Sequence, residues 1–213
     1  MVHARSIRAI STSDVSLEAL RDFRDQLAGD VEVMVDSSQV FLKSAEPPSW
    51  LALLAEAPWW INALGAYAAL FVAKIVEEAA KETWKNRGKA FAAGVDAANR
   101  VKRVAIAMFN LKPNLPPRTR LEIGVPVPDD YFATRLTLDA TDPDNLTLQI
   151  ALFVHHLPAL MGLVEQKQLS RGCVAAGIHL ELLGDGSLEV SWQDNASFKQ
   201  LRHVLPLKDD SAA

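Results

Sequence analysis

The pattern of apolar and polar residues changes its period along the chain. From Ser49 to Asn110 apolar side chains recur every three or four residues, whereas before and after this block they alternate with polar ones. The first spacing is typical of amphipathic helices and the second of half-buried strands. The sequence therefore predicts an α+β protein with a mainly antiparallel sheet and an inserted long antiparallel helical hairpin.

The helical block begins after a proline pair and contains two predicted helices. Pro58 suits the first turn of a helix, and Gly88 is the next strong helix breaker. These signals predict one helix over 58–85 and a second over 89–109. The short turn between them favours an antiparallel hairpin. Residues 48–110 are therefore expected to form a helical hairpin block.

Residues 1–47 are predicted to form a β-α-β-β unit. Strands are expected over 4–10, 31–35 and 40–42, where apolar residues alternate with polar ones. A helix follows the first strand, and Ser13 or Ser16 could cap it. Its buried residues are expected at spacings of three and four: Leu17, Leu20, Phe23 and Leu27.

Residues 118–208 are predicted to form an antiparallel sheet with two helices. The proline-rich run 111–117 is a stiff connector, and it marks the expected boundary with the helical block. The clearest alternation runs from Leu146 to His155 and predicts a strand. The other expected elements are strands over 120–127, 132–139, 176–182 and 188–192, and helices over 158–169 and 195–203.

Composition and charge are those of a soluble globular protein. The chain has 213 residues, of which 49% are hydrophobic and 23% charged, and its formal net charge is −4. A net negative charge provides no overall attraction to nucleic acid, so no nucleic-acid partner is expected. The lone Cys173 excludes an intramolecular disulfide, and no signal-type apolar run follows Met1. A cytoplasmic location is therefore expected.

Sequence motifs that would carry a specific chemistry are absent. The nearest candidate for a phosphate loop, Gly184-Asp185-Gly186, lies between two predicted strands rather than before a helix, so it is interpreted as a turn. The chain has no Gly-x-Ser-x-Gly elbow, and Cys173 lacks the local signature of a nucleophile. No cofactor, metal site or catalytic residue is predicted.

Tryptophan is concentrated in the helical block, which holds four of the five indoles. Tryptophan combines a large apolar surface with a hydrogen-bond donor, so it is common in protein cores and over-represented at interfaces. Packing of the indoles against the sheet is one interpretation. A protein interface is the other, because four indoles within 35 residues exceed what one short helix pair can readily hide in itself. The leading hypothesis is therefore a non-catalytic interaction or assembly module that binds a protein partner or a second copy of the chain. Its expected interface residues are Trp50, Trp59, Trp60, Leu64, Tyr67, Phe71 and Trp84.

The alternative hypothesis is a small enzyme or ligand-binding protein that uses the polar face of the sheet. His155 and His179 would both project from this face if the predicted strands are correct, and a histidine beside a carboxylate could act as a general base. A solvent-facing surface of cross-strand pairs is the competing interpretation. The candidate ligand-site residues are Arg135, His155, His179, Glu181 and Glu189.

A membrane role is the third interpretation. Residues 57–73 contain no charged side chain and begin near two tryptophans, so peripheral contact through 59–73 is conceivable. The following helix carries Arg100, Lys102 and Arg103 near its centre, which opposes a second crossing of the membrane. A soluble hairpin is favoured over membrane contact.

Overall fold

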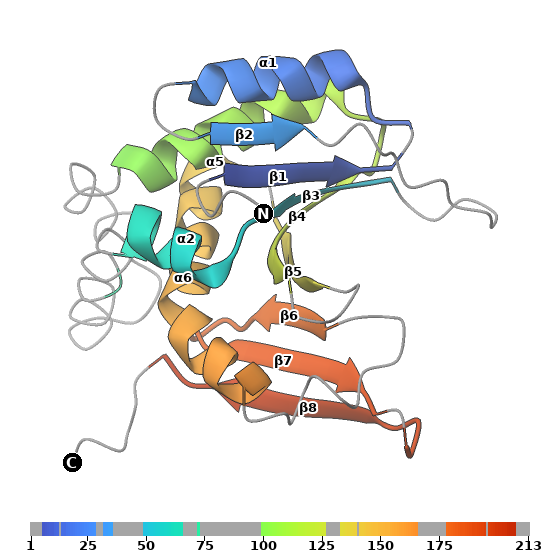
Figure 1. Ribbon diagram of the computed structural model, residues 1–213, viewed down its shortest axis with the longest axis vertical. Helices are drawn as coiled ribbons and strands as arrows, with labels where there is room; N and C mark the ends of the chain where they lie inside the picture. The colour runs from blue at the N-terminus through green and yellow to red at the C-terminus, as the bar shows by residue number, and fades with distance from the viewer. Residues whose placement is uncertain are drawn as a thin grey trace.

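The protein folds around one eight-stranded sheet. Its structure is a computed structural model, in which the strands have the order β2-β1-β3-β4-β5-β6-β7-β8 (Figure 1). The strands come from all three predicted segments of the chain. The described residues are 6–12, 14–28, 32–35, 49–65, 72, 99–126, 133–139, 141–165, 178–194 and 196–207.

The strands pair in a mixed arrangement. β1 with β2, β3 with β4, and β5 with β6 are parallel, and the other neighbouring pairs are antiparallel. The strands are β1 (Ser6–Ser11), β2 (Glu32–Val35), β3 (Trp50–Leu54), β4 (Arg120–Pro126), β5 (Ala133–Leu138), β6 (Ile178–Leu182), β7 (Leu188–Gln193) and β8 (Gln200–Leu205).

The combination of helices with a sheet agrees with the predicted α+β class, but the prediction of a mainly antiparallel sheet was wrong. Parallel neighbours need a long crossover connection, which usually contains a helix. The chain provides three such crossovers, each with a helix between two strands that become parallel neighbours. The helical elements are α1 (Leu17–Leu27), α2 (Ala57–Trp60), the π-helix η1 (Ile61–Gly65), α5 (Asn99–Leu111), the 3-10 helix η3 (Lys112–Asn114) and α6 (Pro143–Glu165).

Helices α1, α5 and α6 enclose the core. α5 contacts both α1 and α6, and α6 also contacts β5, β6 and β8 (Figure 1). Strand β6 contributes every second side chain to this core, because Ile178 and Leu180 are buried and His179 and Glu181 are exposed. The face that bears His179 and Glu181 is called the open face below.

Helix α1 forms as its sequence predicts. The Ser16 hydroxyl accepts a hydrogen bond from the Glu18 main-chain N–H at 3.2 Å, which satisfies a donor at the start of the helix. Leu20, Phe23 and Leu27 are buried against the rest of the core. The predicted amphipathic stripe of this helix is confirmed.

Helix α6 replaces the strand that was predicted over 146–155 and joins it to the helix predicted from Pro158. The Asp142 carboxylate caps it by accepting from the Asn145 N–H at 2.7 Å, and Pro143 occupies its first position. Twelve of its 23 residues are buried. A helix that is enclosed on most sides has apolar residues around most of its circumference. The apolar residues at every second position from Leu146 to Val154 are part of this set, so their alternation did not indicate a strand.

The described part of the helical block differs from its prediction at the first end and agrees in part at the second. Trp50–Leu54 forms β3 rather than helix, since the buried Leu51, Ala52 and Leu53 of this central strand leave no polar alternation. α5 confirms the second predicted helix over part of its length. No long helical hairpin is shown in the described part of the block, and the predicted turn at Gly88 lies outside it.

The helix predicted over 195–203 was also wrong. β8 pairs antiparallel with β7 from Gln193↔Gln200 to Leu188↔Leu205. β8 is an edge strand with five exposed residues, so its apolar residues follow no simple period. The spacing of Phe198 and Leu201 suggested a helical face, but Phe198 is 69% exposed and has a φ of 55° in the preceding turn.

Candidate functional site

A row of polar side chains crosses the open face. Arg135 lies opposite His179, His179 opposite Ser191, and Ser191 opposite Arg202. Residues that face each other across neighbouring strands project from the same side of a sheet. The four side chains therefore form one continuous row from β5 to β8.

A row of carboxylates lies beside this polar row. The Arg135 guanidinium is 3.5 Å from the Glu122 carboxylate, and the Arg202 guanidinium is 3.7 Å from that of Glu189. Glu181 lies opposite Glu189 on the neighbouring strand. Among the described residues, Glu181 has no cationic partner, so it is the unneutralised carboxylate of the row.

Arg135 is fixed by two contacts. Besides its pairing with Glu122, its guanidinium carbon lies 5.5 Å from the centre of the Trp50 ring, a cation–π distance. The Arg135 side chain is 29% exposed and that of Glu122 only 11%. The positive charge of Arg135 is therefore already balanced within the protein.

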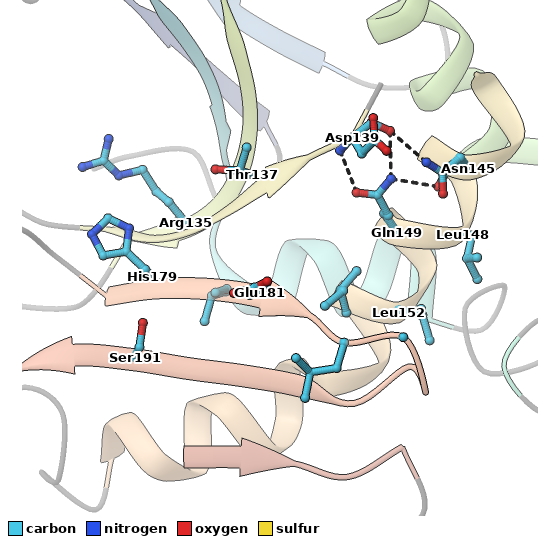
Figure 2. A pocket seen from close by; sticks show the side chains of 14 residues that line it. Arg135, Thr137, Asp139, Asn145, Leu148, Gln149, Leu152, His179, Glu181 and Ser191 are labelled. Atoms are coloured by element: carbon cyan, nitrogen blue, oxygen red, sulfur yellow. Dashed lines mark hydrogen bonds between the residues drawn. The ribbon is translucent and has the colours of Figure 1, made fainter. Parts of the chain in front are cut away.

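A pocket opens where β5 and β6 separate. The two strands pair only from Thr134↔Ile178 to Leu136↔Leu180, and beyond this point they diverge (Figure 2). The space between them is about 500 Å³ and lies at the carboxyl ends of the two parallel strands. Crevices at the carboxyl ends of parallel strands are common ligand sites in open α/β sheets.

The pocket has polar walls on the open face and apolar walls toward the helix. β5 contributes Arg135 and Thr137, Asp139 follows directly after this strand, and β7 contributes Ser191. The remaining lining residues come from α6 and from β6 with its following turn: Asn145, Leu148, Gln149, Leu152, His179, Leu180, Glu181, Leu182, Leu183 and Gly184.

The end of β5 is held against α6 by side-chain amides. The Gln149 amide accepts from the Asp139 N–H and donates to the Asp139 carbonyl, both at 2.9 Å, and Asn145 donates to the same carbonyl at 3.1 Å (Figure 2). These bonds use the main chain of Asp139. Its exposed carboxylate lines the pocket without a partner among the described residues.

Ser191 provides a polar group that lacks a protein partner. The residue is only 9% exposed, and no hydrogen bond joins its hydroxyl to any described residue. Figure 2 shows its hydroxyl directed from β7 toward β6, beneath His179. Among the described residues, the enclosed side-chain oxygen without a partner is that of Ser11, so the Ser191 hydroxyl is open to solvent. It can therefore bond to water or to a bound molecule.

The available chemistry is that of hydrogen bonding and charge. Glu181 and His179 are two residues apart on one strand and share a face, so an imidazole and a carboxylate line the same wall. In the described part of the chain, no three histidine, cysteine or acidic residues are grouped so that they could hold a metal ion.

The structure brings together four of the five predicted ligand-site residues. Arg135, His179, Glu181 and Glu189 share the open face, and the first three line the pocket. His155 does not join them, because it lies on α6 with its Nε2 atom 3.4 Å from the Leu207 carbonyl. Its predicted place on a polar sheet face depended on the incorrect strand assignment.

Several pocket residues were missed by the sequence reasoning. Thr137 and Ser191 alternate with apolar residues in correctly predicted strands, so their place on the polar face could have been found. Asn145 and Gln149 could not have been found, because their segment was assigned to a strand. Asp139 reaches the pocket only because β5 diverges from β6.

The described members of the predicted interface lie within the protein. Trp60 and Leu64 are fully buried and Trp59 nearly so. The Trp60 indole donates to the Gly124 carbonyl at 3.1 Å, and its ring centre is 5.8 Å from that of Phe153. Trp50 contacts Arg135 instead of a partner. Tyr67, Phe71 and Trp84 are outside the described residues, so the interface stays a prediction.

One described helix, Pro143–Glu165, is long and apolar enough to cross a membrane by length and composition alone. The core helix of a soluble protein passes the same criterion, and α6 contacts α5 and three strands. In the segment 59–73, Trp59, Trp60, Leu64 and Val72 are buried, whereas Ile61 is 36% exposed. Membrane contact through this segment stays a prediction.

Comparison with known proteins adds no relative: no family model, curated protein or solved structure matches the chain.

Proposed function

We propose that this protein binds a small organic molecule in the pocket between β5 and β6. The observation that carries the proposal is the separation of these parallel strands beyond Leu136 and Leu180, which leaves a space of about 500 Å³. Small-molecule sites commonly occupy about 300–1,000 Å³ and combine apolar walls with a few placed polar groups. The pocket has both properties.

The walls of the pocket combine apolar and polar side chains, which supports the proposal. Leu148 and Leu152 present an apolar surface from α6, whereas Ser191 and Glu181 offer polar groups that no described residue contacts. The bonds between Gln149 and the main chain of Asp139 hold the two sides together. A preorganised site loses less conformational entropy when a ligand binds.

The proposal is tested by blocking the pocket with a large side chain. Thr137 is exposed on β5 and lines the pocket, so Thr137→Trp should reduce its volume without disturbing the core. Gln200→Trp makes the matching change at an exposed strand position outside the pocket. A fragment library is compared on the wild type and both variants by saturation-transfer NMR.

Compounds that bind the wild type and Gln200→Trp should lose at least about tenfold in affinity for Thr137→Trp, which corresponds to about 1.4 kcal/mol. Circular dichroism of both variants checks that the fold is retained. Equal binding of every compound to Thr137→Trp, or binding of no compound to the wild type, would count against a ligand site here.

A further inference from the structure

We propose that the ligand of this pocket is a small organic amine, bound as its ammonium ion with its apolar part against the leucines. This inference rests on the proposed binding function and adds the charge and chemical class of the ligand. It is carried by three features of the described walls: two carboxylates without a cationic partner, a solvent-accessible hydroxyl without a protein partner, and an apolar floor.

The charges of the lining residues favour a cation. Among the described residues of the lining, Arg135 is the one lysine or arginine, and Glu122 already pairs with it at 3.5 Å. Asp139 and Glu181 contribute two carboxylates that no described residue neutralises. With histidine counted as neutral, the described lining residues and Glu122 together carry a net negative charge. An anionic ligand would be repelled, whereas an ammonium group would supply the missing positive charge.

The hydrogen-bonding groups of the pocket also favour a cationic ligand. The amides of Asn145 and Gln149, which could act as donors, are engaged by the main chain of Asp139. The described lining groups without a partner are the carboxylates of Asp139 and Glu181, the hydroxyls of Thr137 and Ser191, and the imidazole of His179. The two ionised carboxylates only accept hydrogen bonds, and the hydroxyls can accept as well as donate. An ammonium ion has N–H donors and no acceptor, so it matches this set of groups.

The apolar walls of the pocket favour a ligand whose second part is apolar. Leu148 and Leu152 of α6 and Leu180 and Leu182 of β6 line the pocket. An inorganic cation or a fully polar amine would leave these side chains without an apolar partner. An amine with an aliphatic or aromatic body buries apolar surface there, at a gain of about 25 cal/mol per Å².

The test compares pentylamine, 1-pentanol and pentanoate, which differ only in the charge and polarity of the head group. Each is titrated into the full chain at neutral pH and low salt, and dissociation constants are measured from NMR chemical shifts. Pentylamine should bind roughly tenfold more tightly than the other two, since exposed ion pairs contribute up to about 1 kcal/mol each. Added salt should reduce this preference.

Glu181→Gln removes one carboxylate from the pocket, and Glu165→Gln is the matched change at an exposed position at the end of α6. The preference for pentylamine should fall roughly threefold in the first variant and stay unchanged in the second. Tighter or equal binding of pentanol or pentanoate, lost in Thr137→Trp, would overturn the amine assignment and leave the ligand site standing. No binding by any probe, or binding that Thr137→Trp does not weaken, would count against the site itself.

Discussion

Two hydroxyl groups of the sheet differ in what they contact. Thr134 is 1% exposed, and its hydroxyl accepts from the Val125 N–H at 3.1 Å and lies 3.2 Å from the Val125 carbonyl. Ser191 is 9% exposed, and its hydroxyl is open to solvent and hydrogen-bonds to no described residue. The first hydroxyl stabilises the sheet, and the second is available to a ligand.

This difference predicts opposite outcomes for removing each hydroxyl. Thr134→Val should lower the free energy of unfolding by about 1–3 kcal/mol, because the Val125 N–H loses its acceptor. Ser191→Ala should change it by less than about 0.5 kcal/mol while weakening ligand binding. Urea unfolding of both variants checks this, and an equal loss in both would show that Ser191 has a structural partner.

His156 is a buried histidine whose charge state affects stability. Its Nε2 atom is 2.9 Å from the Gly186 carbonyl, and the residue is 3% exposed. Burial lowers the pKa of His156 below its ordinary value of 6.5, and the bond to Gly186 opposes this effect only in part. The neutral imidazole is therefore favoured in the folded protein.

The sign of the resulting pH dependence follows from proton linkage. The unfolded chain takes up the His156 proton near pH 6.5, before the folded chain does. The stabilisation is fully present above this pH and is lost as the pH falls toward the lower folded pKa. Urea unfolding at about pH 7.5 and about pH 5.5 should show a smaller acid-induced loss in His156→Gln than in the wild type. Identical losses would contradict this account of His156.

At the residue scale, three of the 14 described lining residues were predicted from the sequence. Alternation alone placed Arg135, His179 and Glu181 on one face, because a strand turns every second side chain to the same side. The same reasoning failed for His155, whose segment is helical. The spacing of apolar residues therefore predicts the face on which a side chain lies only when the segment is correctly assigned as strand or helix.

At the scale of elements, strand β4 depends on a glycine. A Cβ atom on Gly124 would lie 1.9 Å from the Thr134 carbonyl oxygen, closer than any real contact. The strands β4 and β5 therefore approach each other at a point where no side chain fits. The Gly124 carbonyl also accepts the Trp60 indole N–H, so this point joins the sheet to α2.

Gly124→Ala should consequently lower the free energy of unfolding by about 1–3 kcal/mol or more, because the backbones of β4 and β5 must move apart. Gly162→Ala is the matched control, since a Cβ at this position of α6 meets nothing within 4 Å. It should instead raise stability by about 0.5–1 kcal/mol through its better helix propensity. Thermal unfolding of both variants gives the two signs, and a neutral Gly124→Ala would contradict the described close approach.

The elements that were predicted correctly are those with one buried and one exposed side. Helix α1 shows the expected apolar stripe, and β6 alternates buried and exposed residues. Helix α6, in contrast, has buried residues around most of its circumference, so its apolar pattern fits a strand as well as a helix. Asp142 followed by Pro143 was the available signal, because this pair commonly starts a helix.

At the scale of the whole molecule, the parallel pairing of strands was not readable from local patterns. The registers of β1 with β2, β3 with β4 and β5 with β6 depend on where the intervening helices return the chain. The pocket arises from this global arrangement, since it lies where one of the parallel pairs ends. The sequence predicted a polar face, but it could not predict that the sheet opens beside it.

The central claim for the whole molecule is that the opening between β5 and β6 binds a ligand. Backbone amide NMR spectra of the full chain, recorded while its tightest-binding fragment is titrated, test this most directly. The largest shifts should map to Thr137, Glu181 and Ser191, with small changes in α1 and β2. Shifts concentrated on another surface, with the amides around the opening unchanged, would contradict the assignment.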